Sequence, residues 1–224
     1  MPDPHTPGTG RERPWKVYGR LLLLALLVML FLSASRLMLV TTLWDRVEPT
    51  DGLAFIFLQG VRFDLVWVGQ FFGLALLAAP WLRLRPRLRG IGRLVLPLWV
   101  GLVCAGGFFV EAATLDFIRE YDSRPNYLFV EYLRYPREVF TQLAATHLPQ
   151  LLGITAATVL IGALAFRWLR RDPTWDWTLR ARTATVMTLV LGAVLFVSIR
   201  STFDHRPINP GIAAFSDDAL VNQL

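Results

Sequence analysis

Apolar residues along the chain are gathered into five long runs that are separated by shorter polar stretches. The runs cover roughly residues 18–43, 62–82, 94–117, 148–166 and 183–200. A helix needs about 20 residues to cross a hydrocarbon core, and every run is close to that length. Backbone groups in lipid must be hydrogen-bonded within their own segment, so each run is expected to be helical. The pattern therefore predicts an all-α membrane protein with five transmembrane helices.

The first run also has features of a cleavable signal peptide. Basic residues precede the stretch LLLLALLVMLFL, and the small residues SAS follow it. Apolar sequence resumes at once with LMLVTTLW, however, so the whole run is long enough to cross a membrane. We therefore expect the first run to remain in the protein as a transmembrane helix.

Composition supports the membrane class and excludes some partners. Hydrophobic residues make up 54% of the 224 residues, and the mean hydropathy is +0.44. The formal net charge of +6 does not come from basic residues interleaved with aromatic ones, so no nucleic-acid partner is predicted. The chain has one cysteine, Cys104, which excludes an intrachain disulfide.

The distribution of basic residues predicts how the chain is oriented in the membrane. Residues 1–20, 83–93 and 167–182 hold 14 of the 23 lysines and arginines, while the alternate connections hold most of the acids. Connections rich in lysine and arginine stay in the cytoplasm. We therefore expect a cytoplasmic N-terminus, with residues 1–17 as a disordered Pro/Gly-rich start, and an extracytoplasmic C-terminus.

The longest connection, residues 111–147, lies on the predicted outer side. Residues 126–143 of it are expected to form an interfacial helix broken near Pro136, with aromatic side chains dipping into the headgroups. Either lipid handling or simple anchoring would explain this composition. Four of the five tyrosines are in this connection: Tyr121, Tyr127, Tyr132 and Tyr135.

Ionisable residues recur at a similar depth near the predicted outer ends of the first three helices. The rise of an α-helix places Arg36 roughly 27 Å from the start of the first run, in the outer leaflet. Arg62 and Asp64 point about 200° apart on their helix, so each must find a partner elsewhere. The cluster is either a pocket for the headgroup of an anionic glycerophospholipid or a structural ion-pair network. Its members are Arg36, Arg62, Asp64, Glu111 and Asp116.

No catalytic or metal-binding motif is present in the sequence. GxSxG, HExxH, phosphate loops and Cys/His clusters are all absent. The adjacent pair Asp204 and His205 favours turn chemistry over catalysis, because neighbours in an extended segment point apart. The sequence therefore gives no catalytic residue, no metal ligand and no cofactor for this chain.

The final stretch, RSTFDHRPINPGIAAFSDDALVNQL, resembles the segment that joins the membrane part to the catalytic domain in lipoteichoic acid synthase-like phosphoglycerol transferases. GVRFDL (60–65) and the five-helix plan are similar too. This family belongs to the sulfatase and alkaline phosphatase superfamily. The matching residues include Arg200, Phe203, Asp204, His205, Arg206, Pro207 and Asn209.

The resemblance implies a bacterial cytoplasmic (inner) membrane protein whose membrane domain covers residues 18–200. Residues 201–224 would be a juxtamembrane connector to an extracytoplasmic catalytic domain, in cis or on a separate chain. In the family, that domain binds a divalent metal, typically manganese, and transfers phosphoglycerol from a membrane lipid to a glycan or glycolipid. We expect this chain alone to be inactive. The alternatives are a non-enzymatic membrane subunit that binds lipid or a partner, and a small transporter.

Overall fold

The computed structural model describes residues 14–125, 134, 136–200 and 214–224, and these residues contain helices and no strand. Five of the helices contain a stretch long and apolar enough to cross a membrane, which confirms the predicted number. The chain is therefore a multi-pass helical membrane protein. These helices are α1 (Gly19–Thr42), α3 (Leu53–Trp81), α4 (Pro86–Tyr121), α6 (Pro136–Arg170) and α7 (Ala181–Arg200).

Short elements connect or flank the long helices. The turn from α1 to α3 contains α2 (Trp44–Val47) and η2 (Glu48–Thr50), and η2 ends at Asp51 in the left-handed conformation. The remaining short elements are the 3-10 helices η1 (Pro14–Tyr18), η3 (Pro173–Asp176) and η5 (Val221–Gln223).

α3 and α4 begin earlier than the apolar pattern predicts, as does α6, which is described below. α3 begins at Leu53 rather than at residue 62, although Gln59 and Arg62 interrupt its apolar sequence. These polar positions do not break the helix, because its backbone hydrogen bonds do not depend on side-chain polarity. α4 begins at Pro86 rather than at residue 94, with its arginine-rich first turns outside the apolar stretch. Proline is well suited to the first turn, where its missing N–H has no helical partner.

Two other expectations are corrected or fall partly outside the described residues. Residues 14–17, expected to be disordered, belong to η1, where Val17 and Tyr18 are buried against the bundle. The expected interfacial helix at 126–143 lies outside the described residues up to 133. From Pro136 the chain is a single helix that continues into the fourth apolar run, because Pro136 starts the helix rather than breaking it.

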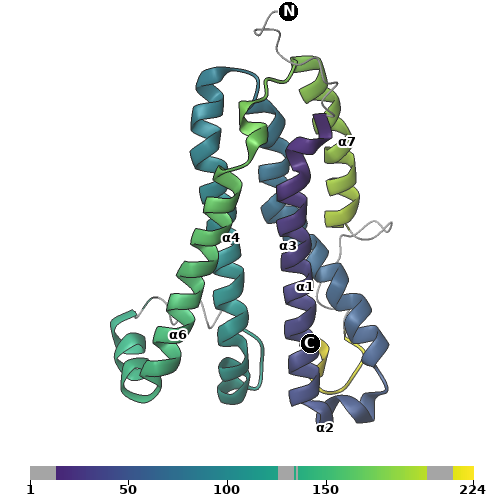
Figure 1. Cartoon of the computed structure of the whole chain (residues 1–224). Coiled ribbons are helices and arrows are strands. Elements are labelled where there is room, and N and C mark those ends of the chain that lie inside the picture. The colour runs from purple at the N-terminus through teal and green to yellow at the C-terminus, as the bar shows by residue number, and fades with distance from the viewer. Residues whose placement is uncertain (1–13, 126–133, 135, 201–213) are drawn as a thin grey trace, which may run out of the picture.

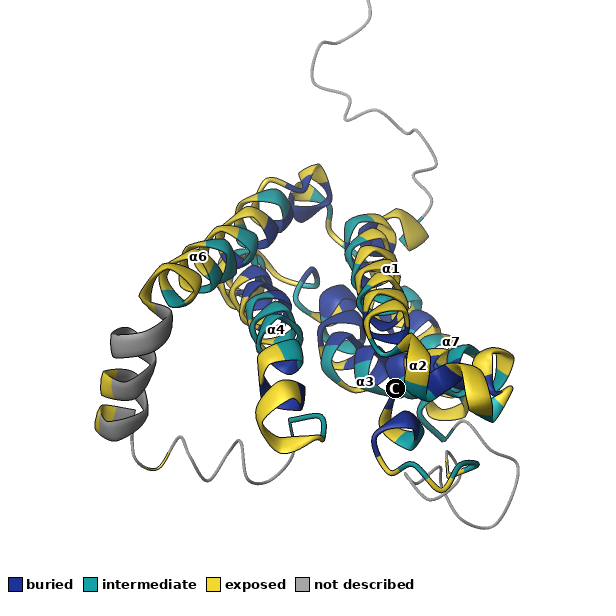
Figure 2. Cartoon of the chain, turned by 90° about the horizontal axis from the view of Figure 1, so that it is seen from below, coloured by how far each residue is buried: buried dark blue, intermediate teal, exposed yellow. Residues whose placement is uncertain are grey.

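The long helices form two groups with a cleft between them. α1, α3 and α7 pack together, and α4 pairs with α6 (Figures 1 and 2). α3 and α4 join through a short turn at one end of the bundle, and the groups stand apart at the other end, where α2 lies. The apolar side chains left exposed on α1, α6 and α7 are the surface expected to face lipid.

The 214–224 segment returns to the end of the bundle that carries α2. Leu220 and Val221 are buried there against Leu39 and Val40 of α1. The Phe215 ring lies over Gly52, where an added Cβ would lie 2.0 Å from a ring carbon, so a larger residue at position 52 would displace the ring. The end of the described chain is therefore part of the bundle, at the same end as α2 (Figure 1).

Candidate functional site

A cavity of about 1060 Å³ occupies the cleft between α3 and α4. Its walls are mainly apolar and come from residues 55–71 of α3 and 99–114 of α4, and α1 contributes Leu32 and Arg36. The 214–224 segment lines the end near α2. An apolar volume with a few convergent polar groups is the usual form of a small-molecule or lipid site.

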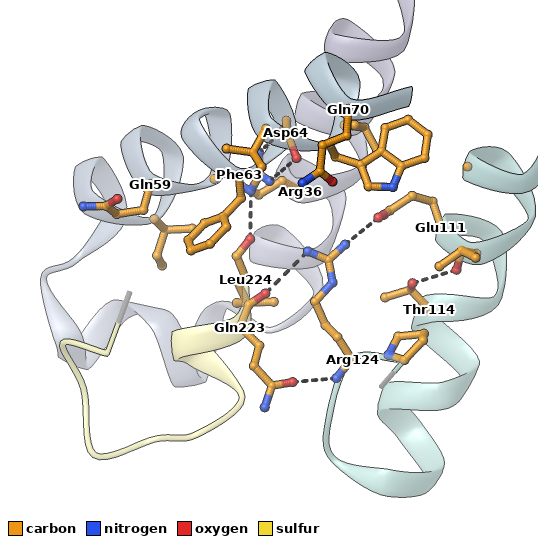
Figure 3. A pocket seen from close by; sticks show the side chains of 18 of the residues that line it. Arg36, Gln59, Phe63, Asp64, Gln70, Glu111, Thr114, Arg124, Gln223 and Leu224 are labelled. Atoms are coloured by element: carbon orange, nitrogen blue, oxygen red, sulfur yellow. Dashed lines mark hydrogen bonds and ion pairs between the residues drawn. The ribbon is translucent and has the colours of Figure 1, made fainter. Parts of the chain in front are cut away.

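A buried ion pair joins α1 to α3 at the wall of this cavity. Nη1 and Nη2 of Arg36 donate to the two carboxylate oxygens of Asp64 at 2.8 and 2.9 Å (Figure 3). Nε of Arg36 donates to the backbone oxygen of Leu224 at 2.8 Å. Arg36 is 3% exposed, so its charge is balanced almost entirely by Asp64 rather than by water. The guanidinium therefore ties together α1, α3 and the 214–224 segment.

Gly60 makes room for this ion pair on α3. A Cβ at Gly60 would lie 2.1 Å from Nε and 2.2 Å from Cζ of Arg36. The Arg36 side chain therefore crosses α3 directly over the glycine, one turn before Asp64. This close approach explains a glycine in the middle of a helix, where the residue is otherwise unfavourable.

A second ion pair lies on the α4 side of the cavity. Nη2 of Arg124 donates to Oε1 of Glu111 at 2.7 Å, and Oγ of Ser35 donates to Oε2 at 2.6 Å. The backbone N–H of Arg124 also donates to the side-chain oxygen of Gln223 at 2.8 Å. Both oxygens of Glu111 are thus occupied, and Arg124 connects α4 to the 214–224 segment (Figure 3).

Arg46 of α2 holds the outer edge of the 214–224 segment. Its guanidinium donates to both carboxylate oxygens of Asp218, at 2.7 and 2.8 Å, and to Asp122, the left-handed residue that ends α4. These hydrogen bonds raise the pKa of Arg46. The hydrogen bonds from Arg46 also lower the pKa of Asp218 from its usual value of 3.8. The backbone N–H groups of Val221 and Leu220 contribute less to this shift, and partial desolvation opposes it.

The lowered pKa of Asp218 predicts that acid weakens the docking of the 214–224 segment. A carboxyl with a depressed folded-state pKa stabilises the docked state above its unfolded pKa, and this contribution is lost as the pH falls through the folded value. We expect hydrogen exchange at Leu220 and Val221 to become faster as the pH falls below 3.8, after correction for intrinsic rates. Asp218→Asn should exchange faster at pH 7 and lose this part of the pH dependence. Equal pH dependence in both proteins would contradict the assignment.

Two side chains that line the cavity can form hydrogen bonds but have no hydrogen-bond partner in the described part of the chain. Gln70 points from α3 into the cavity (Figure 3), and the indole of Trp67 lines it three residues earlier. Neither side chain hydrogen-bonds to another described residue, whereas the indole N–H of Trp99 donates to the backbone oxygen of Phe71. Gln70 is an exposed residue that lines the cavity, so its amide is available to hydrogen-bond a polar occupant.

The structure brings together three of the five ionisable residues singled out in the sequence. Arg36, Asp64 and Glu111 all line the cavity. Arg62 does not line it and donates to Gln59 at 2.8 Å. Asp116 is exposed and pairs with Arg119 one turn away. Of the residues in the final stretch, Arg200 ends α7, whereas Phe203, Asp204, His205, Arg206, Pro207 and Asn209 lie outside the described residues.

The most important residues that sequence reasoning missed are Arg124 and Gln70. The partners of Arg124 are 13 and 99 residues away in the sequence, and no local sequence pattern predicts contacts between residues so far apart. Gln70 did carry a signal, because it is a polar residue inside an apolar run, away from the ends of that run. Such residues are rare in membrane helices and often mark sites.

The other end of the bundle holds a buried arginine with a structural role. Arg83 is 2% exposed, lies over the Trp175 ring at 4.1 Å, and donates to the backbone oxygen and hydroxyl of Thr174. Burial lowers its pKa to about 10, although Asp172 and Tyr18 oppose the shift. These contacts fasten the α6–α7 connection to the end of α3, far from the cavity.

No group of three His, Cys, Asp or Glu side chains that could hold a metal ion occurs within the described ranges. The two acids that line the cavity, Asp64 and Glu111, are held in ion pairs with Arg36 and Arg124. Comparison with known proteins adds no assignment: no family model matches the sequence, and no solved structure matches the fold.

Proposed function

We propose that this chain is the membrane domain of a lipoteichoic acid synthase-like phosphoglycerol transferase, and that it holds a membrane lipid in the cavity between α3 and α4. The reaction class rests on the resemblance of the final stretch and of GVRFDL. In this proposal the transfer chemistry and its divalent metal belong to a catalytic domain outside these residues. The chain itself anchors that domain and presents lipid to it.

The observation that carries the lipid-holding role is the amphipathic cavity. It is about 1060 Å³ in volume, which suits a lipid headgroup with part of its acyl chains. Most of its wall is apolar, and its hydrogen-bonding groups are contributed by α1, α3, α4 and the 214–224 segment.

The proposed orientation follows from the charges at the two ends of the bundle. Arg83 and its arginine-rich neighbours gather at the end where α3 joins α4, and Asp122 and Asp218 lie at the end that carries α2. The positive-inside tendency then favours a cytoplasmic N-terminus. The 214–224 segment and the cavity would lie towards the extracytoplasmic side of the membrane, where a connector to the catalytic domain belongs.

Obstruction of the cavity tests the lipid-holding role. Gly106 lines the cavity, and a Cβ there meets nothing within 4 Å, so Gly106→Trp places a large side chain in it without a backbone clash. The protein is reconstituted in phosphatidylethanolamine and phosphatidylglycerol vesicles with a trace of diacyl lipid bearing a photoactivatable diazirine on one acyl chain. Mass spectrometry should locate adducts on cavity-lining peptides of α3 and α4. We expect about tenfold fewer of these adducts in Gly106→Trp.

Gly153→Trp is the matched control. Gly153 is an exposed glycine of α6 that does not line the cavity, and a Cβ there also meets nothing within 4 Å. This variant should label like the parent protein at the cavity peptides, while both variants keep the general labelling of lipid-facing surfaces. Equal cavity labelling in the parent and both variants would show that the cavity holds no lipid.

A further inference from the structure

The charged side chains that line the cavity cancel in pairs. Four ionisable residues are among the described residues that line it, namely Arg36, Asp64, Glu111 and Arg124. Arg36 is bound to Asp64, and Arg124 is bound to Glu111. The formal charge of these four side chains is therefore zero, and each of the two arginines is already paired.

Recruiting either arginine to a phosphate would break an ion pair. The side chain of Glu111 is 13% exposed, so loss of Arg124 would leave its carboxylate poorly hydrated and without a cation. Removing one member of a buried pair is strongly unfavourable. Arg62, the other arginine of this part of α3, donates to Gln59 and does not line the cavity. The electrostatics thus disfavour the anionic headgroup that the sequence pattern suggested.

The polar groups that remain available are uncharged. The Gln70 amide and the Trp67 indole have no partner among the described residues, and both line the cavity. Gln70 lies 17 residues after Leu53, about 26 Å along a helix of about 43 Å, at the depth of the apolar part of α3. The Gln70 amide can both donate and accept, as a hydroxyl group does, so hydroxyl groups can satisfy it without introducing charge.

We infer that the cavity takes a diacyl lipid whose headgroup is uncharged and carries hydroxyl groups, as in diacylglycerol or a glycosyl diacylglycerol. This inference rests on the proposed lipid-holding function and specifies its ligand. The acyl chains lie along the apolar walls, to which Phe63, Leu102 and Val103 contribute. The hydroxyl groups lie within reach of Gln70, which is on the same helix as Asp64 and six residues after it.

Native mass spectrometry of the full chain in detergent tests this selectivity. The probes are dioleoylglycerol, monoglucosyl dioleoylglycerol and dioleoylphosphatidylglycerol, which share acyl chains and differ in the headgroup. We expect at least one of the two neutral lipids to bind about tenfold more tightly than phosphatidylglycerol. Comparison of the two neutral lipids then identifies whether the sugar contributes. Gly106→Trp should remove the preference, which places it in the cavity.

Two further variants separate charge from hydrogen bonding. Gln70→Leu should weaken binding of the neutral lipids about tenfold and leave binding of phosphatidylglycerol unchanged. Gln150→Leu, at an exposed α6 position outside the cavity, should change the binding of neither. Glu111→Gln removes the charge that neutralises Arg124, so it should strengthen binding of phosphatidylglycerol about tenfold.

The outcomes distinguish this inference from the function on which it rests. If phosphatidylglycerol binds as tightly as the neutral lipids and this binding is lost in Gly106→Trp, the inference is overturned, but the cavity still holds lipid. A neutral-lipid preference unchanged in both Gly106→Trp and Gln70→Leu would also overturn it, because the site would then lie elsewhere. Absence of binding by all three lipids would overturn the lipid-holding function itself.

Discussion

Asp64→Ala is expected to lower the free energy of unfolding by about 3–5 kcal/mol, because it leaves the buried Arg36 without its carboxylate. Arg36 is 3% exposed and donates two of its three side-chain hydrogen bonds to Asp64. The measurement is unfolding of the purified protein in mixed micelles, followed by circular dichroism. We expect a correspondingly low yield of folded protein from membranes.

Asp116→Ala is the matched control, because it makes the same substitution at an exposed carboxylate that pairs only with Arg119. It should change stability by less than about 1 kcal/mol. The double variant Arg36→Met/Asp64→Leu should recover most of the loss, since two apolar side chains replace both charges. A double variant no more stable than Asp64→Ala would show that shape at this site, rather than the unpaired charge, limits stability.

Gly101→Leu is expected to destabilise the bundle by about 3 kcal/mol by separating α4 from α6. A Cβ at Gly101 would lie 2.8 Å from the backbone oxygen of Gly162, and a Cβ at Gly162 would lie 3.1 Å from Ala105 Cβ. Small residues allow membrane helices to approach this closely, and a backbone atom cannot move aside as a side chain can. Thermal unfolding in detergent measures the loss.

Gly90→Leu provides the control for this effect within α4. Gly90 is exposed, and a Cβ there meets nothing within 4 Å. The variant makes the same change in helix propensity, which favours leucine over glycine, so we expect unchanged or slightly higher stability. A similar loss in both variants would mean that the α4–α6 crossing does not require glycine.

The five membrane helices could be predicted because apolar run length follows directly from membrane thickness. The starts of α3 and α4 could not, because the apolar pattern reports contact with lipid and not the end of a helix. Gln59 and Arg62 look like a boundary in the sequence, yet they are internal to α3. The packing of α4 on α6 through Gly101 and Gly162 depends on contacts between residues 61 positions apart, which one sequence does not reveal.

The candidate site could be predicted in part from the sequence, for a similar reason. Charged residues in an apolar run are rare enough to mark Arg36, Asp64 and Glu111 without a structure. Helical geometry excluded a pair between Arg62 and Asp64, but it left several other pairings open. The choice of Asp64 for Arg36, and of Arg124 for Glu111, depends on tertiary packing. That choice leaves both arginines of the cavity paired with a carboxylate.

The 214–224 segment contacts three arginines on different parts of the bundle, and it also lines the cavity. Thermodynamic linkage is reciprocal, so a ligand that binds more tightly when the segment is docked must stabilise docking by the same free energy. Binding of a ligand in the cavity and docking of the segment would therefore each favour the other. Through this coupling, any protein attached to the segment would sense whether the cavity is loaded.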